Sequence, residues 1–272
     1  MSSIPQVSIK DLIEVGAHFG HSVRRWNPAM NKYIFGKKNG IHIIDLAQTA
    51  PMLHRALYAI KTIAANGGKF LFVATKKQAQ EIVKEGALMC GQYYVNERWL
   101  GGMLTNYKTI SKSISKLEDL EKKLAEGRET GYTKKELSGM QKQYQKLNAV
   151  LGGIRTMGGL PDAVIVIDVC KDDLAVVEAN SANIPVFGIC DTNANPQNVT
   201  FPIPGNDDAL RAIKYYIDMF TKAILEGLSE QLQNASKHSE EVSEAIASSV
   251  DNTDDKSNNV ISVDEKTFTK GE

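Results

Sequence analysis

Apolar residues follow two different periods along the chain. Short runs rich in β-branched and aromatic residues, each bounded by turn residues, predict strands at 41–45, 70–75, 93–95, 164–169 and 186–190. Two of these runs are apolar on both faces, as expected for strands covered by helices on both sides. Between the runs, helical spacing predicts helices, one ending at Asn66-Gly67-Gly68 and another carrying Leu210, Ile213, Ile217, Phe220 and Ile224. Strands and helices alternate, which predicts an α/β fold with a doubly wound, mainly parallel sheet.

A second pattern interrupts this alternation over residues 107–151. One apolar stripe consists of Ile110, Ile114, Leu117, Leu120 and Leu124, and another consists of Leu137, Met140, Tyr144, Leu147 and Leu151. The latter has the spacing of a heptad repeat. A turn-rich connector at 127–131 separates the stripes, and Thr133 with Glu136 has the spacing of a capping box that restarts a helix. The pattern predicts an antiparallel coiled-coil hairpin, 107–151, inserted into an α/β body formed by 1–106 and 152–228.

The composition changes again near the end of the chain. Residues 229–272 are rich in Ser, Asn, Asp and Glu and have few apolar side chains. Such a segment does not bury enough apolar surface to offset the entropy lost on ordering. We therefore expect residues 229–272 to form a disordered, acidic tail.

The sequence also indicates the cellular compartment in which the protein is expected. The longest aliphatic run, 163–167, is far shorter than the roughly 18 residues that span a bilayer, and the first residues lack a basic-then-apolar leader. Cys90, Cys170 and Cys190 are an odd number of cysteines, at spacings that fit neither a disulfide framework nor a zinc ribbon. We expect a cytoplasmic protein whose core requires no cofactor.

Charge is distributed unevenly, although the 272 residues carry 32 basic and 32 acidic side chains and no net charge. Residues 1–158 hold 24 basic and 12 acidic side chains, whereas 159–228 and 229–272 each hold 4 basic and 10 acidic ones. The excess of positive charge in the first part predicts an anionic partner, and nucleic acid is the leading candidate. The alternative, for lysines after Lys108, is an ordinary solvated helix face.

Basic residues alternate with aromatic residues in three clusters of this positive part. Guanidinium and ammonium groups bind phosphates, and planar rings stack on unpaired bases or pack beneath arginines, so the mixture suits RNA. Lys76 and Lys77 follow a predicted strand at the start of a helix, where backbone N–H groups also favour anions. The predicted RNA-binding residues are Arg24, Arg25, Trp26, Lys32, Lys37, Lys38, Lys76, Lys77, Arg98 and Lys108. Trp26 and Trp99 are also natural packing residues.

A second possibility is an α/β enzyme or binding protein for a phosphorylated ligand, because α/β sheets bind ligands at the carboxyl ends of their strands. A phosphorylated ligand would need a phosphate-binding loop, but neither G-x-G-x-x-G after a strand nor G-x-x-x-x-G-K-[ST] occurs. The G-x-S-x-G elbow of hydrolases does not occur either. A third possibility is a coiled-coil adaptor with no role in RNA binding.

Acidic residues gather where strands are predicted to end. Asp191 follows the strand ending at Cys190. Asn206 is expected to cap the final helix, with Asp207 and Asp208 in its first turn, so all three aspartates are expected at one edge of the sheet. Carboxylates and one imidazole, His18 of the His-Phe-Gly-His motif, would suit Zn²⁺ or Mg²⁺. The alternatives are that Asp207 and Asp208 complement a helix dipole, that Asp191 caps its own turn, and that the histidines form hydrogen bonds within their loop.

Several stretches of the sequence resemble the bacterial small-subunit ribosomal protein two family. They cover about residues 8–228, in the order of that family, with the coiled-coil insertion where the family has it. The family usually has glycine at the position of Ala74, before Thr75-Lys76-Lys77. The matching stretches are GAHFGHSVRRWNP from Gly16, GIHIIDL from Gly40, ERWLGGMLTNY from Glu97, residues 188–199 with Asp191-Thr192-Asn193, and IPGNDDA from Ile203.

This resemblance implies a flavodoxin-like α/β body in a structural component of the ribosome that catalyses no reaction. It implies binding to small-subunit ribosomal RNA between the head and body of the subunit. It also implies contacts with other small-subunit proteins, among them ribosomal protein one, the messenger-binding protein, which it would help to recruit. No membrane and no small-molecule substrate are expected as partners.

Overall fold

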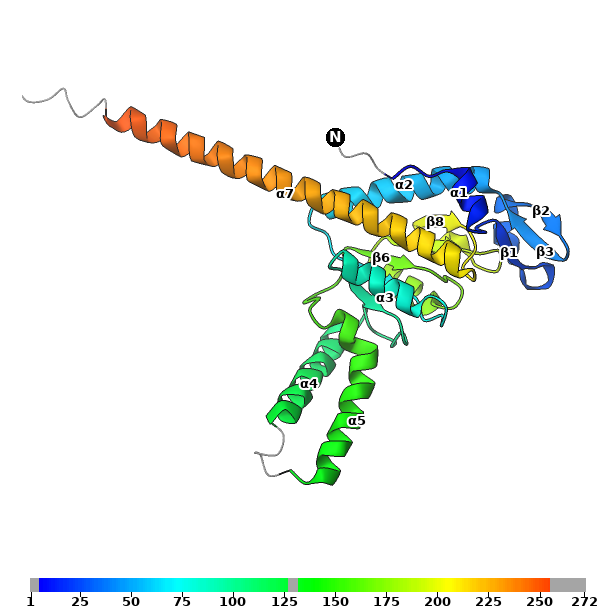
Figure 1. The fold of residues 1–272 in the computed structure, drawn as a ribbon, viewed down its shortest axis with the longest axis horizontal. Coiled ribbons are helices and arrows are strands. Elements are labelled where there is room, and N and C mark those ends of the chain that lie inside the picture. The colour runs from blue at the N-terminus through cyan, green and yellow to red at the C-terminus, as the bar shows by residue number, and fades with distance from the viewer. Residues whose placement is uncertain (1–4, 127–131, 255–272) are drawn as a thin grey trace, which may run out of the picture. The chain divides into compact units, whose positions relative to one another are not determined.

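A five-stranded parallel sheet forms the centre of the computed structural model, which describes residues 5–126 and 132–254 (Figure 1). The spatial order is β5-β4-β6-β7-β8. Numbered along the chain within this sheet, the order becomes 2-1-3-4-5, that of flavodoxin-like folds. The predicted parallel α/β sheet is therefore confirmed. Its strands are β4 Phe70–Val73, β5 Tyr93–Val95, β6 Ala163–Val166, β7 Val186–Cys190 and β8 Phe201–Pro204.

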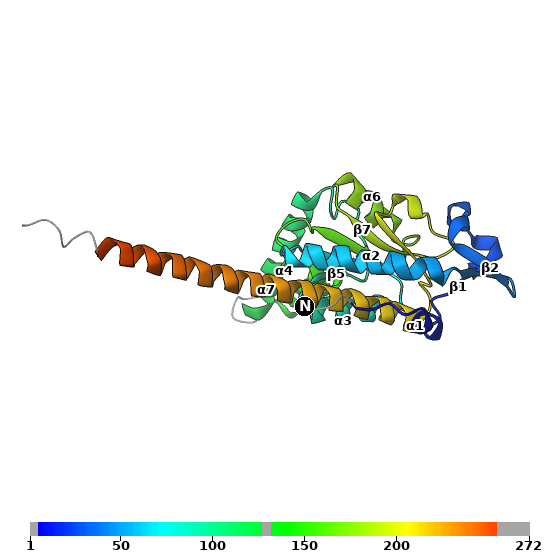
Figure 2. The same cartoon turned by 90° about the horizontal axis from the view of Figure 1, so that it is seen from above.

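Helices cover both faces of this sheet (Figures 1 and 2). Side chains alternate along β4, so Phe70 and Phe72 enter one core while Leu71 and Val73 enter the other. The first core also contains residues of α2, α3 and the first part of α7. The second contains residues of α6 and the base of α4. The helices are α1 Ile9–Glu14, α2 Leu46–Ala65, α3 Gln80–Met89, α4 Tyr107–Glu126, α5 Lys134–Leu151, α6 Asp173–Ser181 and α7 Leu210–Asp254.

A small antiparallel sheet precedes the parallel one in the chain. It has the order β1-β3-β2, with β1 at Phe19–Ser22, β2 at Ile34–Lys38 and β3 at Ile41–Ile44. The predicted strand at 41–45 thus belongs to this sheet and not to the central one. Short 3-10 helices flank it, η1 at Val23–Arg25 and η2 at Pro28–Tyr33, and two more lie at Gly152–Ile154 and Pro196–Asn198.

Residues 107–151 form two helices that contact each other, α4 and α5 (Figure 1). Ile110, Ile114, Leu117 and Leu120 of α4 are buried. The capping box at the start of α5 is present, because Thr133 and Glu136 each accept a hydrogen bond from the other's backbone N–H. The connector 127–131 lies outside the described residues. Coiled-coil packing of the two helices stays a prediction.

The chain divides into two units, residues 1–229 and 230–272. Helix α7 continues to Asp254, so residues 230–254 are helical where the composition predicts disorder. That stretch contains no Pro or Gly and several Ala, Glu and Gln residues, which favour a helix. Residues 255–272 lie outside the described residues. In the part of the chain that is described, no helix is long and apolar enough to cross a bilayer.

Candidate functional site

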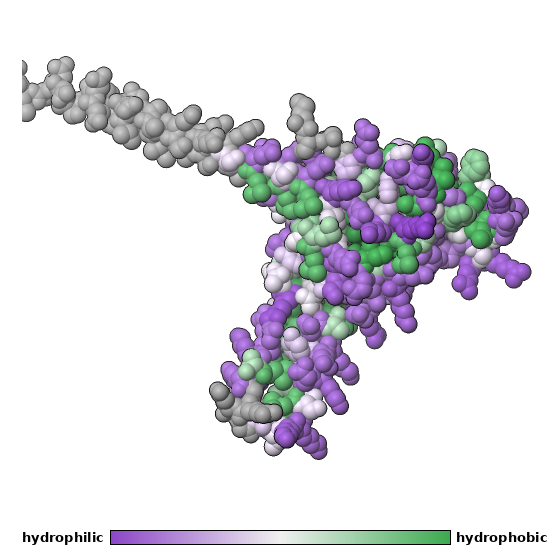
Figure 3. Space-filling model, in the orientation of Figure 1, coloured by the Kyte–Doolittle hydropathy of each residue, from purple (hydrophilic) through white to green (hydrophobic). Residues whose placement is uncertain are grey.

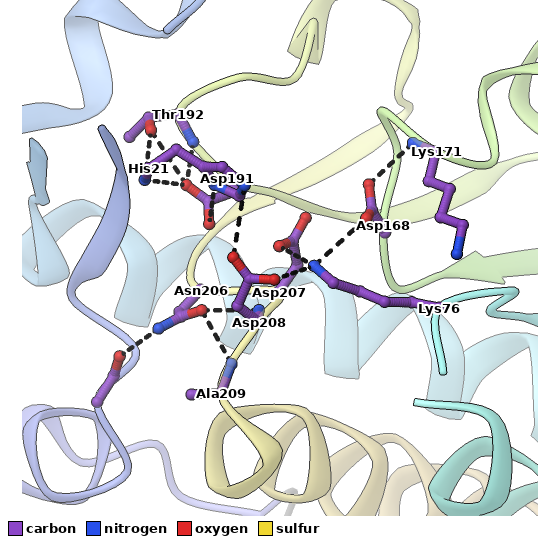
Figure 4. A network of polar contacts seen from close by, with 11 residues as sticks. His21, Lys76, Asp168, Lys171, Asp191, Thr192, Asn206, Asp207, Asp208 and Ala209 are labelled. Carbon is purple, nitrogen blue, oxygen red and sulfur yellow. Dashed lines mark hydrogen bonds and ion pairs between the residues drawn. The ribbon is translucent and has the colours of Figure 1, made fainter. Parts of the chain in front are cut away.

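Four loops at the carboxyl edge of the parallel sheet bring charged residues together (Figure 4). Lys76 follows β4, Asp168 follows β6, Asp191 follows β7, and Asp207 with Asp208 follows β8. Parallel strands end at the same edge of a sheet, which explains why residues so distant in sequence meet here. Asp191 and Asp207 are both 1% exposed. We call these five residues and His21 the edge cluster.

His21 reaches the edge cluster from β1 of the small sheet (Figure 4). Its Nδ1 lies 2.9 Å from Oδ2 of Asp191, and its Nε2 lies 3.4 Å from Oδ2 of Asp208. Its backbone N–H donates to Oδ1 of Asp191 and to Oγ1 of Thr192. A Cβ on Gly20 would lie 2.6 Å from Cγ2 of Thr192. Glycine at this position therefore allows β1 to approach the loop after β7.

Further hydrogen bonds attach the N-terminal segment to the same edge. Asn206 donates from its backbone N–H to the carbonyl oxygen of Ala17 and from Nδ2 to that of Gly16. The N–H of Asn27 donates to the carbonyl oxygen of Thr192 over 2.7 Å. The small sheet is thus anchored to the loops after β7 and β8.

Asn206 also shapes the turn that carries the two adjacent aspartates. Its Oδ1 accepts hydrogen bonds from the backbone N–H groups of Asp208 and Ala209. Helix α7 begins only at Leu210 and has no acidic residue in its first turn. Asp207 and Asp208 therefore precede the helix, and the expectation that they occupy its first turn is wrong.

Lys76 lies among the carboxylates. Its Nζ is 2.8 Å from Oδ1 of Asp207, 2.5 Å from Oδ1 of Asp208 and 3.5 Å from Oδ2 of Asp168. Burial lowers the pKa of this ammonium group, but the hydrogen bonds to Asp207 and Asp208 outweigh burial and raise it overall. Lys76 was predicted to contact RNA. Its charge is instead engaged within the protein, because the loop after β4 turns it toward the edge cluster.

The proton affinities of His21 and Asp207 are both raised. Contact with the Asp191 carboxylate raises the pKa of His21 to about 9, against the opposing effect of burial. Burial raises the pKa of Asp207 to about 7, with the neighbouring charges of Asp168 and Asp191 acting in the same direction. Four carboxylates thus share one imidazolium and one ammonium group, and the cluster retains an excess of negative charge.

The imidazole of the cluster is that of His21, and the prediction of His18 is wrong. The carboxylates of Asp191, Asp207 and Asp208 and a ring nitrogen of His21 all lie within 4.8 Å of one another. His18 is not part of this group; its ring contacts that of Phe19, and its Nδ1 has no hydrogen-bond partner among the described residues.

These four residues fit a divalent cation. Three carboxylates and one imidazole form a donor set that Zn²⁺ binds in proteins. Nδ1 of His21 and Oδ2 of Asp191 form an ion pair at 2.9 Å, and neither buried atom has a hydrogen-bond partner among the described residues. A bound cation would replace this contact and use both atoms as ligands.

Most of the predicted RNA-binding residues are exposed, but they do not form one cluster. Arg24, Arg25, Lys32, Lys37 and Lys38 are exposed on η1, η2 and β2, around the small sheet. Exposed residues also occur in the loops after β4 and β5 and at the start of α4, namely Lys77, Arg98 and Lys108.

The two tryptophans have packing roles. The half-buried ring of Trp26 lies 5.3 Å from the ring of His42. Trp99 is buried, and its Nε1 donates to Oε1 of Glu178, a residue that sequence reasoning missed. Glu178 also accepts from the N–H groups of Gly102, Leu104 and Thr105. One buried carboxylate thus fixes the loop after Arg98.

The carboxyl edge of the parallel sheet also provides evidence on whether the protein binds a phosphorylated ligand. The N–H and Oγ1 of Thr75, in the loop after the first strand of the sheet, both donate to the carboxylate of Asp172, at 3.0 and 2.8 Å. In flavodoxin-like folds the loop after the first strand supplies such donors to phosphate. The donors of Thr75 are engaged by the protein itself.

Comparison with known proteins assigns the chain to a family. The family model for ribosomal protein S2 matches residues 12–227. The chain belongs to the ribosomal protein S2 family. It is 54% identical over 233 residues to small ribosomal subunit protein uS2 of Rhodospirillum centenum, covering 86% of this chain and 89% of that protein. The uS2 of Paramagnetospirillum magneticum is 53% identical over 230 residues, covering 85% and 86%.

The resemblance seen in the sequence is therefore confirmed. The match includes the small sheet, the edge cluster, α4 and α5, and it ends two residues before the boundary between the two units. Residues 228–272 fall outside it.

Proposed function

We propose that the chain is a structural component of the small ribosomal subunit, where it binds ribosomal RNA and catalyses no reaction. The observation that carries this proposal is the group of exposed basic residues around the small sheet, Arg24, Arg25, Lys32, Lys37 and Lys38, within the part that matches the S2 family. The relatives are named as proteins of that subunit. As a ribosomal component it would work in the cytoplasm.

Cosedimentation with small subunits at low and high salt tests this function. Replacing Arg24 and Arg25 with Ala should lower subunit occupancy and reduce the salt dependence of RNA binding by up to about 0.9 for each lost phosphate contact. Replacing exposed Lys214 and Lys222 of α7 removes the same charge elsewhere and serves as the control. Unchanged occupancy and salt slope in the arginine variant would contradict the assignment.

We also propose that the small sheet helps to dock small-subunit ribosomal protein one. Phe35 is 80% exposed and Phe19 is 48% exposed, and large exposed apolar groups are typical of protein contacts. Phe35 lies at a shift in register between β2 and β3, where a bulge turns its side chain outward. A Phe35→Ala variant should occupy the subunit as the wild type does. In the same sedimentation experiment, these subunits should carry less ribosomal protein one. Full retention of that protein would contradict this docking site.

A structural divalent cation is proposed at His21, Asp191, Asp207 and Asp208. When bound, it would supply positive charge that joins the small sheet to the loops after β7 and β8. Metal analysis of the purified protein tests this proposal, with Asp207→Ala/Asp208→Ala as the variant and Asp218→Ala on α7 as the control. Stoichiometric zinc or magnesium should be present in the wild type and the control and lost from the variant. No bound metal in the wild type would leave hydrogen bonding and charge pairing as the role of these residues.

A further inference from the structure

Helix α5 has an unusual balance of charge. It carries Lys134, Lys135, Lys142 and Lys146 but only one acidic residue, Glu136. The carboxylate of Glu136 accepts hydrogen bonds from the N–H and the Oγ1 of Thr133, so it is engaged at the helix N-terminus. The positive charge along the rest of the helix therefore has no acidic counterpart on α5 itself.

Three of these lysines lie on the outward side of the helix. Leu137, Met140, Tyr144 and Leu147, which form the apolar stripe, are half-buried, whereas Lys135, Lys142 and Lys146 are exposed. No carboxylate of the described residues forms an ion pair with these three lysines. Two acidic residues of the neighbouring helix, Glu118 and Glu121 of α4, pair with Arg155. Figure 3 shows hydrophilic groups projecting along the hairpin formed by α4 and α5.

The residues between the lysines on the same face of α5 have small side chains or none. Gly139 and Ala149 share it, and together with Lys142, Gln143, Gln145 and Lys146 they line a shallow hollow. Glycine destabilises the interior of a helix relative to alanine. A Cβ added at Gly139 would meet no atom within 4 Å, so packing inside the protein does not require glycine here. The missing side chain is explained if a partner approaches the helix closely at this point.

We propose that the outward face of α5, formed by Lys135, Gly139, Lys142, Lys146 and Ala149, binds the sugar–phosphate backbone of RNA. The three lysines extend over about 16 Å along the helix axis, at a rise of about 1.5 Å per residue. This face has no aromatic residue, so it contacts phosphates and ribose without stacking on bases. It is a second RNA contact, separate from the small sheet.

This inference rests on the proposed function, and filter binding of the full chain to purified small-subunit ribosomal RNA over a range of salt concentrations tests both. A Lys135→Gln/Lys142→Gln/Lys146→Gln variant should bind more weakly, with a salt slope lower by up to about 0.9 for each lysine. The matched control replaces three exposed lysines elsewhere, Lys10, Lys214 and Lys222, with Gln. Its salt slope should stay close to that of the wild type.

Gly139→Leu tests the close approach without changing charge. Leucine is a good helix former, so the melting temperature should stay the same or rise, while RNA affinity should fall because the side chain fills the hollow. Gln141→Leu, at an exposed position on another side of the same helix, is the control and should bind RNA like the wild type.

The outcomes separate the two proposals. If the wild type does not bind the RNA, the proposed function itself fails. If the wild type binds and the Arg24/Arg25 variant is weakened, but the triple lysine variant and Gly139→Leu behave like their controls, the function stands and α5 is only a solvated arm.

Discussion

Glu178 shows how one buried side chain determines the shape of a neighbouring basic loop. The residue is 5% exposed, and its carboxylate accepts hydrogen bonds from four N–H groups, those of Trp99, Gly102, Leu104 and Thr105. Burial opposes ionisation of Glu178, but these hydrogen bonds outweigh it and hold the pKa below its ordinary value. The position of exposed Arg98, directly before Trp99, therefore depends on a residue of α6.

Replacing Glu178 with Ala should lower the free energy of unfolding by about 3 kcal/mol or more, because several buried donors lose their acceptor. Since the folded pKa of Glu178 is depressed, its contribution is present above the ordinary pKa of a glutamate and is lost as pH falls. Urea denaturation at neutral and acidic pH measures both effects, and the difference between wild type and variant should shrink at acidic pH. Glu97→Ala, an exposed carboxylate nearby, is the control. A variant as stable as this control would refute the role of Glu178.

For the edge cluster, the sequence predicts the three aspartates and the presence of a histidine, but not which histidine. The sequence places Asp191 after a strand and Asp207 with Asp208 at the start of the final helix, and the structure brings the three together as expected. His18 lies directly before β1, whereas His21 lies within it, where the pairing with β3 is irregular. Choosing between them requires the pairing of β1, which no local pattern reveals. Lys76 had a local signal for anion binding, but its partners are carboxylates that lie more than 90 residues away in the chain.

At the scale of elements, periodicity predicts the long helices and the buried strands and misses β1, β2 and β8. The apolar runs at β4, β6 and β7 are covered on both sides, so their composition alone identifies them. Strand β8 contains Pro202 and Pro204, which hide it from such a search; as an edge strand it tolerates them. Strands β1 and β2 contain glycine or lysine within runs of four and five residues.

The seam between α4 and α5 gives a prediction at this scale. Leu117 is fully buried and Leu147 is half-buried, so Leu117→Glu should separate the two helices more completely than Leu147→Glu. The central sheet should remain folded, because the core on one of its faces contains no residue of the hairpin. Hydrogen exchange should show faster exchange along α4 and α5 with protection of β4, β6 and β7 unchanged. Ser115→Glu, on the exposed side of α4, is the control, and slow exchange in Leu117→Glu would contradict this role of the seam.

For the whole molecule, a formal net charge of zero understates the positive character of the surface. Residues 159–228 hold ten acidic side chains, but five of them are buried: Asp168, Asp172, Glu178, Asp191 and Asp207. By contrast, Arg24, Arg25, Lys32, Lys37 and Lys38 are all exposed. A count over the sequence cannot separate buried charge from exposed charge. The charge asymmetry between the two parts of the chain nevertheless predicts an anionic partner, which agrees with the proposed function.

Removal of residues 232–272 should leave the melting temperature almost unchanged, because the segment is polar and Leu232 at its start is 71% exposed. The helical signal in circular dichroism should fall, since residues 232–254 belong to α7. Removal of residues 255–272 alone, beyond the end of α7, is the control and should change neither quantity. An unchanged helical signal after the longer truncation would show that α7 ends earlier in solution and that the composition predicted the segment correctly. A large fall in melting temperature would show that the segment packs on the protein, contrary to what its composition implies.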